Sequence, residues 1–198
     1  MKKTLLALLA GATLALAGAA HAGVTNFDEL NTAGDFASLA DINPYAGLTW
    51  GGDWYAGDAG IDGYANGAHS GANFAINGFG ADPAEISSAS AFNFTGAWFA
   101  APVGAADKAT WVNISAYDAA NHLIGSTGNV AIGAGYVWVG GGFDNVSRLS
   151  ITRDTGWYAM DDFTTTISVA APVPEPGTSL MLALGLLTLV AVRRRPAR

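Results

Sequence analysis

The sequence predicts an all-β protein with a single β-sandwich domain, and three features of its central part predict this fold. Apolar and polar residues alternate with a period of two in several short segments, which is typical of strands with one buried face. Glycine, asparagine, aspartate and proline separate these segments, and 26 of the 198 residues are glycine. The segments are spaced as in β-sandwiches, and the chain length suits one domain.

The clearest predicted strand is 163–169. Apolar and β-branched residues recur there at every second position, with threonine and serine between them, so one face would be buried and the other polar. The other predicted strands, apart from a hairpin, are 25–30, 48–50, 72–79, 90–99, 135–139 and 146–153.

The predicted hairpin follows the same alternation. Segment 111–117 alternates apolar with polar residues, and the turn-forming residues 118–121 join it to a partner strand at 122–126. Only 35–40 looks locally helical, and Pro44 would end a helix there.

The first 22 residues have the three parts of a secretory signal peptide. Two lysines precede an apolar stretch at 5–20, and Ala20 and Ala22 form an A-x-A cleavage site. The apolar stretch is shorter than the roughly 20 residues that a spanning helix needs, although a retained anchor is the alternative interpretation. We therefore expect signal peptidase to cleave after Ala22, so that the mature domain comprises residues 23–171.

The chain ends in a second three-part segment, residues 172–198. Pro174, Glu175 and Pro176 precede an apolar stretch at 178–192, which a cluster of arginines follows. A helix over this stretch would be about 22 Å long, against about 30 Å for the hydrocarbon core. Terminal arginines stay on the cytoplasmic side, so the segment predicts a short transmembrane helix with the domain outside the cytoplasm.

This order of Pro-Glu-Pro, apolar helix and arginine cluster closely resembles the PEP-CTERM sorting signal of Gram-negative bacteria. The cluster consists of Arg193, Arg194 and Arg195. The resemblance implies recognition in the inner membrane by an exosortase, a cysteine-dependent transpeptidase-like enzyme, and removal of the tail. It also implies release or attachment at the cell surface of a bacterium that makes exopolysaccharide, as in a biofilm. The alternative, an ordinary single-span anchor, also places the domain outside the cytoplasm.

Residues 23–171 are strongly acidic. Fifteen aspartates and glutamates stand against Lys108, Arg148 and Arg153, a net charge of −12, whereas the whole chain carries −7. Such a surface repels phosphate backbones and anionic lipid headgroups, which argues against nucleic-acid binding and peripheral membrane binding. It suits neutral glycans, cations or polycations.

Short motifs in the domain show a weaker resemblance to a second family. The stretches 27–30, 117–118 and 160–163 resemble the galactose-binding-like jelly-roll domains of exported bacterial proteins. The resemblance implies a jelly-roll-like sandwich whose first and last strands are neighbours. It bears on the fold rather than on sugar binding, because a fold does not fix a function.

The sequence lacks the usual catalytic and cofactor motifs. The domain has two histidines, His69 and His122, and the chain has no cysteine, which leaves too few soft ligands for a typical zinc site. It has no H-E-x-x-H, G-x-S-x-G or Walker loop. The spacing leaves open a triad of His122, Asp118 and a serine, but an exposed hairpin histidine is commoner. We expect no enzymatic activity.

Two groups of carboxylates are candidates for Ca²⁺, which prefers several oxygen ligands. One group lies in the glycine-rich stretch 53–63, whose spacing does not match an EF-hand loop, and the other would lie between strands. The candidate ligands are Asp53, Asp58 and Asp62 in the first group and Asp28, Asp161 and Asp162 in the second. Solvated turn carboxylates are the alternative. Asp161 and Asp162 also suggest a glycosidase pair, but adjacent strand residues point to opposite faces.

Aromatic residues are the remaining functional signal. Trp54, Tyr55 and Trp157 lie among glycines and aspartates, so they are candidate glycan contacts on loops, with packed loop anchors as the alternative. The tryptophans predicted to lie in the core are Trp98, Trp111 and Trp138.

The sequence thus predicts an exported, exosortase-processed protein of the cell surface or extracellular matrix with a structural or adhesive role. The alternative is a Ca²⁺-dependent carbohydrate-binding module associated with exopolysaccharide, and a secreted hydrolase is a third hypothesis. Signal peptidase and exosortase are the expected partners.

Overall fold

The computed structural model describes residues 20–78 and 82–168. The predicted transmembrane helix at 178–192 and the sorting residues Pro174 to Pro176 and Arg193 to Arg195 lie outside the described residues. Within the described residues, no helix is long and apolar enough to cross a membrane. The compact unit runs from Ala20 to Ser168.

The domain is all-β, as predicted, and a single short 3-10 helix is its helical element among the described residues. The strands are β1 (Ala20–Thr25), β2 (Ala37–Ser38), β3 (Thr49–Trp50), β4 (Trp54–Asp58), β5 (Asn73–Asn77), β6 (Ala84–Ala100), β7 (Trp111–Tyr117), β8 (Leu123–Ser126), β9 (Val130–Ala131), β10 (Val137–Arg153) and β11 (Ala159–Ser168), and the helix is η1 (Ala40–Ile42).

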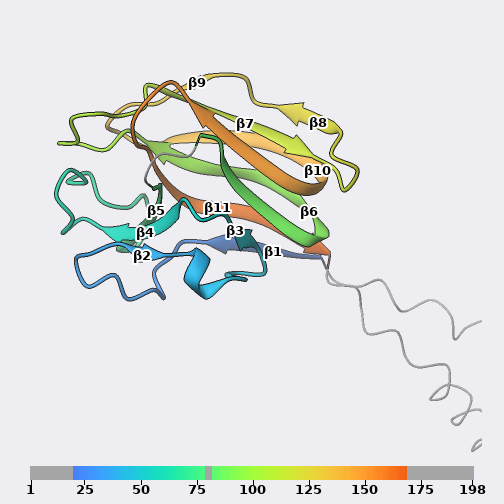
Figure 1. The fold of residues 1–198 in the computed structure, drawn as a ribbon, viewed down its shortest axis with the longest axis horizontal. Coiled ribbons are helices and arrows are strands. Elements are labelled where there is room, and N and C mark those ends of the chain that lie inside the picture. The colour runs from blue at the N-terminus through green and yellow to red at the C-terminus, as the bar shows by residue number, and fades with distance from the viewer. Residues whose placement is uncertain (1–19, 79–81, 169–198) are drawn as a thin grey trace, which may run out of the picture. The chain divides into compact units, whose positions relative to one another are not determined.

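Hydrogen bonds join these strands into one antiparallel sheet rather than two separate ones. The order is β2-β4-β5-β11-β6-β10-β7-β8, with β1 on β11, β3 on β6 and β9 on β7. The central pair, β6 and β10, are 17-residue strands whose register shifts at several bulges. Figure 1 shows β7, β8 and β10 on one side of the domain, with β1, β4, β5 and β11 on the other. Because bulges bend a strand, β6 and β10 can contribute to both sides of the domain.

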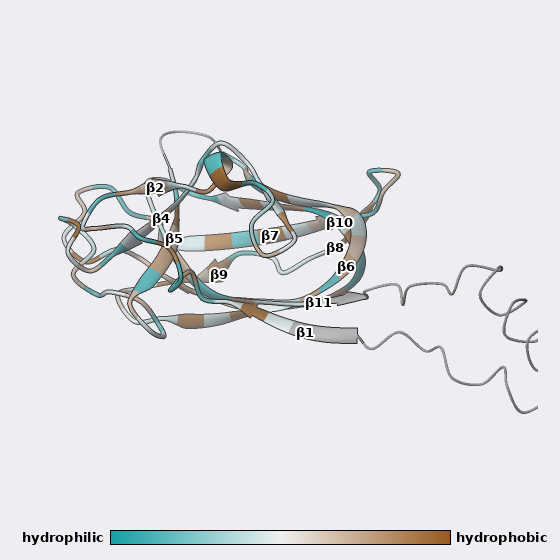
Figure 2. Cartoon of the chain, turned by 90° about the horizontal axis from the view of Figure 1, so that it is seen from below, coloured by the Kyte–Doolittle hydropathy of each residue, from teal (hydrophilic) through white to brown (hydrophobic). Residues whose placement is uncertain are grey.

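The core lies between these two sides. Hydrophobic and hydrophilic residues alternate along β7, as Figure 2 shows, and its inward residues Val112, Ile114 and Ala116 are fully buried. Trp50 packs edge-on against Trp54 and Phe163, with ring centroids 5.5 Å and 5.6 Å away. Such aromatic contacts supply a large share of the apolar burial that holds a domain of this size together.

Several predicted elements differ from the structure. Segment 146–153 and residues 137–139 of segment 135–139 belong to one strand, β10, because bulges carry its pairing with β6 past the glycines at 140–142. The predicted strand at 25–30 ends at Thr25, since Phe27 adopts a left-handed φ of 63° and a turn begins. The predicted helix at 35–40 is instead β2 followed by η1.

The predicted signal cleavage site falls within β1. Ala20 and Ala22 pair through the backbone with Ser168 and Thr166 of β11. Cleavage after Ala22 would leave 23–25 of this strand to pair with β11. The first and last strands of the domain are neighbours, as the jelly-roll resemblance implied.

Candidate functional site

Three neighbouring strands place an aspartate and two tryptophans in one row across the sheet. Asp161 of β11 is the register partner of Trp98 of β6, and Trp98 is the register partner of Trp138 of β10. Residues opposite each other in antiparallel strands project from the same face. Ala97 and Phe99, which flank Trp98 in sequence, are fully buried. The row therefore lies on the side of the sheet that faces away from the core.

A bulge in β11 brings a second carboxylate to this row. The register with β6 shifts between Asp161 and Thr164, and Asp162 has a left-handed φ of 48°. Aspartate tolerates this conformation better than most residues, and it breaks the alternation of an extended strand. The carboxylates of Asp161 and Asp162 consequently lie together. The expectation that they point to opposite faces is wrong.

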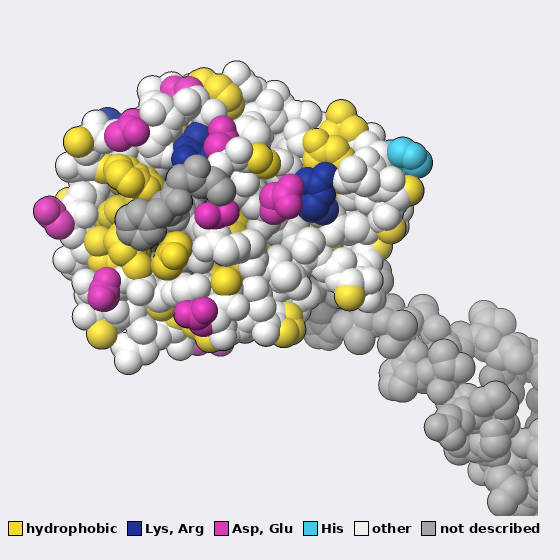
Figure 3. Space-filling model, viewed as in Figure 1, with side chains coloured by type: hydrophobic (Ala, Val, Ile, Leu, Met, Phe, Trp, Pro, Cys, Tyr) yellow, Lys and Arg dark blue, Asp and Glu magenta, His cyan; other side chains and the backbone are white. Residues whose placement is uncertain are grey.

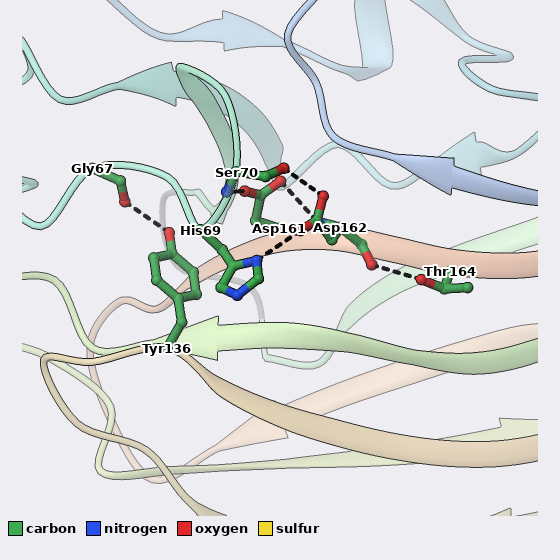
Figure 4. A network of polar contacts seen from close by, with 7 residues as sticks. All are labelled: Gly67, His69, Ser70, Tyr136, Asp161, Asp162 and Thr164. Carbon is green, nitrogen blue, oxygen red and sulfur yellow. Dashed lines mark hydrogen bonds and ion pairs between the residues drawn. The ribbon is translucent and has the colours of Figure 1, made fainter.

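The segment before β5 folds over these carboxylates, as Figure 4 shows. The backbone N–H of Ser70 donates a hydrogen bond to Asp161 Oδ2 at 2.8 Å, and the Ser70 hydroxyl donates to Asp162 Oδ1 at 2.6 Å. His69 Nδ1 lies 2.7 Å from Asp162 Oδ2. Within the described part of the chain, His69, Asp161 and Asp162 are the one group of three histidine or acidic side chains whose ligand atoms lie within 4.8 Å of one another.

Aromatic rings hold the His69 imidazole in place. It stacks on Trp98 with a centroid distance of 4.0 Å and an interplanar angle of 12°, and the Tyr136 ring meets it edge-on at 5.7 Å. The Tyr136 hydroxyl in turn donates a 2.8 Å hydrogen bond to the carbonyl of Gly67 (Figure 4). The loop that carries His69 is therefore held by two contacts, the stack of His69 on Trp98 and the hydrogen bond from Tyr136 to Gly67.

Asp161 lies in an electrostatically unusual position. Its side chain is fully buried, and this burial raises the pKa of its carboxyl to about 7. Hydrogen bonds from the backbone N–H groups of Ser70 and Asp162 lower the pKa and so oppose this shift, whereas the neighbouring Asp162 carboxylate raises it further. Burial and the same two carboxylates also raise the pKa of the Tyr136 hydroxyl. Two carboxylates this close disfavour each other's ionised form, so the site favours a bound proton or cation.

Trp138 extends the site into solvent. Its side chain is 38% exposed, and its ring meets Trp98 at a centroid distance of 5.7 Å. A Cβ atom at Gly96 would lie 2.5 Å from the Trp138 ring, so the glycine is what lets the indole rest on β6. We call His69, Trp98, Trp138, Asp161 and Asp162 the acidic-aromatic patch.

The prediction that Trp98 and Trp138 lie in the core is therefore wrong. Trp98 is half-buried and Trp138 is exposed, because both occupy the outward positions of their strands. Trp111, the third tryptophan predicted for the core, is also only half-buried.

The aspartates of the first predicted calcium group do not come together in the structure. Asp58 lies in β4, where its carboxylate accepts hydrogen bonds from the Thr32 hydroxyl and the backbone N–H groups of Gly34 and Gly60, which lower its pKa. Asp53 precedes β4, and Asp62 is exposed beside a separate hollow. Among the described residues, these three aspartates do not form a group whose ligand atoms are close enough to share a cation.

The second predicted calcium group is only partly assembled. Asp161 and Asp162 come together, but their third partner is His69. Asp28 instead accepts hydrogen bonds from the backbone N–H groups of Ala72 and Asn73, so its carboxylate anchors the start of β5.

The predicted glycan contacts separate as well. Trp54 is fully buried and donates its indole N–H to the carbonyl of Glu85, so its assignment as a surface contact is wrong. Tyr55 is half-buried in β4 and packs against Phe36. Trp157 is half-buried and lines a hollow of about 290 Å³ together with Asp62 and other residues.

Sequence reasoning missed His69, Trp98 and Trp138 as site residues. A signal for Trp98 was present, because it alternates with Ala97 and Phe99 and a strand that buries these two must turn Trp98 outward. Nothing local in the sequence places His69 beside an aspartate 93 positions later.

Solved structures resemble the domain distantly. A tandem of two CBM22 domains from Paenibacillus barcinonensis Xyn10C is 15% identical and covers 82% of this chain, with a TM-score of 0.44. This chain spans 50% of the length of that tandem. The CBM22-1 xylan-binding domain of the same protein is 15% identical, with 79% of this chain and 99% of that domain covered and a TM-score of 0.42. The K2 cleaved adhesin domain of Lys-gingipain is 10% identical, with 74% and 99% covered and a TM-score of 0.40. No curated protein is similar enough to the chain to count as a match.

The end of the chain matches a defined sorting signal. Residues 172–195 match the PEP-CTERM protein-sorting motif, which contains the predicted Pro-Glu-Pro and arginine residues. This motif implies processing by an exosortase, in agreement with the resemblance seen in the sequence. The chain therefore carries a PEP-CTERM sorting motif and is an exported protein that is sorted to the cell surface.

Proposed function

We propose that this protein has an adhesive role at the cell surface or in the extracellular matrix, where its domain binds a neutral polysaccharide through the acidic-aromatic patch. The observation that carries the proposal is the exposed indole of Trp138, which rests on Gly96 in the same row as Trp98 and Asp161. A flat ring held in this way can stack on the apolar face of a sugar, while the partly exposed Asp162 carboxylate and His69 imidazole hydrogen-bond to its hydroxyls.

The charge of the domain supports a neutral rather than an anionic glycan. Three basic residues stand against 15 acidic ones between positions 23 and 171, and Figure 3 shows acidic side chains spread over one face with few basic ones among them. Uronate or sulfate groups would be repelled by this field. The patch itself adds the partly exposed carboxylate of Asp162, which lies beside the buried Asp161.

A binding role suits the patch better than hydrolysis. The ligand oxygens of Asp161 and Asp162 lie within 4.8 Å of each other, whereas the two carboxyls of a glycosidase lie about 5–9.5 Å apart on either side of the bond to be cleaved. Both oxygens of Asp161 also accept backbone hydrogen bonds. The close spacing and these hydrogen bonds favour binding over hydrolysis.

Glycan binding by single-tryptophan variants tests the proposal. The full chain, purified in mild detergent, would be applied to an array of neutral glucans, mannans and xylans, with alginate as the anionic comparison. Trp138→Ala should abolish binding, because it removes the stacking surface, whereas Trp157→Ala should leave binding unchanged. If Trp157→Ala abolishes binding and Trp138→Ala does not, the glycan site lies in the hollow lined by Trp157, and our assignment is wrong.

A further inference from the structure

His69, Asp161 and Asp162 offer one nitrogen and two oxygens to a common point. Their ligand atoms lie within 4.8 Å of one another, and His69 Nδ1 is 2.7 Å from Asp162 Oδ2. Ligands of a zinc-sized ion at about 2.0–2.2 Å stand no more than about 4.4 Å apart. Metal binding therefore requires some movement of the exposed His69 and the half-buried Asp162 side chains towards the buried Asp161.

The neighbours of these three side chains hold them as the second coordination shell of a metal site does. Ser70 donates its backbone N–H to Asp161 and its hydroxyl to Asp162, and the backbone N–H of Asp162 donates to Asp161 Oδ1 at 2.7 Å. The stack on Trp98 sets the plane of the imidazole, so that Nδ1 is directed at the carboxylates. Outer contacts of this kind orient metal ligands and raise affinity.

We propose that His69 Nδ1 and one oxygen each of Asp161 and Asp162 bind a divalent first-row transition metal ion, with Zn²⁺ as the preferred member. The two carboxylates neutralise the ion, which in turn offsets the cost of burying Asp161 beside a second acid. Imidazole suits Zn²⁺ and its neighbours in the first row, whereas Ca²⁺ takes six to eight oxygen ligands. The site therefore differs from the calcium site that the sequence suggested.

The side chain of His69 is about a third exposed, so the ion would be reached from solvent and would keep at least one position for water. A metal ion on Nδ1 requires the neutral tautomer of His69 that carries its proton on Nε2. The inference does not depend on glycan binding, because the metal is tested alone.

The decisive experiment is titration calorimetry of the metal-stripped full chain, in mild detergent, with ZnCl₂ and with CaCl₂. We expect one Zn²⁺ per chain and a rise in Tm with Zn²⁺, since a ligand of the native state stabilises it, and no comparable heat with CaCl₂. Absence of Zn²⁺ binding, or Ca²⁺ binding as tight as that of Zn²⁺, overturns the proposal. In that case the group is a hydrogen-bonded His69–Asp162 pair.

Matched histidine variants locate the site. His69→Phe keeps a ring to stack on Trp98 but removes the nitrogen, and His122→Phe makes the same change at an exposed histidine that contacts Asp118 in a hairpin. The first should weaken Zn²⁺ binding by at least about tenfold, and the second should not change it. The reverse pattern overturns the proposal.

A second variant and a spectroscopic measurement distinguish the loss of a metal ligand from misfolding of the His69→Phe variant. Asp162→Asn preserves the shape of the side chain and an acceptor for Ser70 but removes the charge, and it should also weaken Zn²⁺ binding. Substituted Co²⁺ should give visible d–d bands in the wild type that both variants lose. Retention of these bands in folded Asp162→Asn and His69→Phe contradicts the assignment.

Discussion

The substitution Gly96→Ala tests how the sheet presents Trp138. A methyl group at this position would lie 2.5 Å from the Trp138 ring and 2.7 Å from the carbonyl oxygen of Val139. The second contact involves backbone, so movement of the indole alone cannot relieve the clash. Overpacking of this kind costs typically about 1–3 kcal/mol of unfolding free energy.

Thermal unfolding measures this cost. For a domain of this size each kcal/mol lowers Tm by roughly 2–4 °C, so Gly96→Ala should lower Tm by between about 2 and 12 °C. The displaced indole should change its fluorescence emission, and glycan binding should fall. Gly133→Ala is the matched control, because a Cβ atom there meets nothing within 4 Å. If Gly96→Ala has the Tm and the emission spectrum of the wild type, Trp138 does not rest on β6 and the basis of the patch is removed.

Two further predictions concern buried and charged hydrogen bonds. Asn77 is fully buried, donates to the Gly156 carbonyl and accepts from the Tyr158 N–H, so Asn77→Ala should lose about 2–6 kcal/mol in chemical denaturation, with Asn77→Asp intermediate. Burial alone would raise the pKa of Asp154, but hydrogen bonds from the hydroxyl and N–H of Thr110 outweigh it and lower the pKa to about 2. The unfolded carboxyl titrates near pH 4, so the contribution of Asp154 is present above that pH and is lost as the pH falls towards 2. The Asp154→Asn variant should lose less stability than the wild type over this acid range, and identical pH profiles would contradict the assignment.

The strands that the sequence predicted best are those in which side-chain alternation and local turns decide the structure. Segment 111–117 matches β7 because its apolar residues recur at every second position and a turn follows it. The strand at 163–169 corresponds to most of β11 for the same reason. The frequent glycine and aspartate of the stretch 53–63 predict a loop, yet β4 forms within it. Pairing with β5 along its full length and burial of Trp54 outweigh the turn-forming composition.

Burial was harder to predict for tryptophan than for aliphatic residues. A large ring favours the core in general, and Trp98 and Trp138 stand in predicted strands, so the sequence predicts a core position for both. The glycine and aspartate neighbours of Trp54 instead predict a loop. In the structure all three depend on strand face. Trp54 points inward from β4, while Trp98 and Trp138 occupy outward positions of β6 and β10. The side of the strand on which a tryptophan lies therefore decides its burial, and the size of its ring does not.

The patch depends on a single backbone irregularity, the bulge at Asp162, which no local sequence pattern predicts. A regular β11 would send Asp161 and Asp162 to opposite faces, and one of the two carboxylates would point into the core beside Phe163. The left-handed turn at Asp162 avoids this by placing both carboxylates on the outer face while Phe163 remains fully buried. Burial of a charged carboxylate in an apolar core costs far more than the left-handed conformation of one aspartate. The Asp-Asp-Phe sequence is thus compatible with a strand at this place only through a bulge, and the same bulge makes the two carboxylates available to His69.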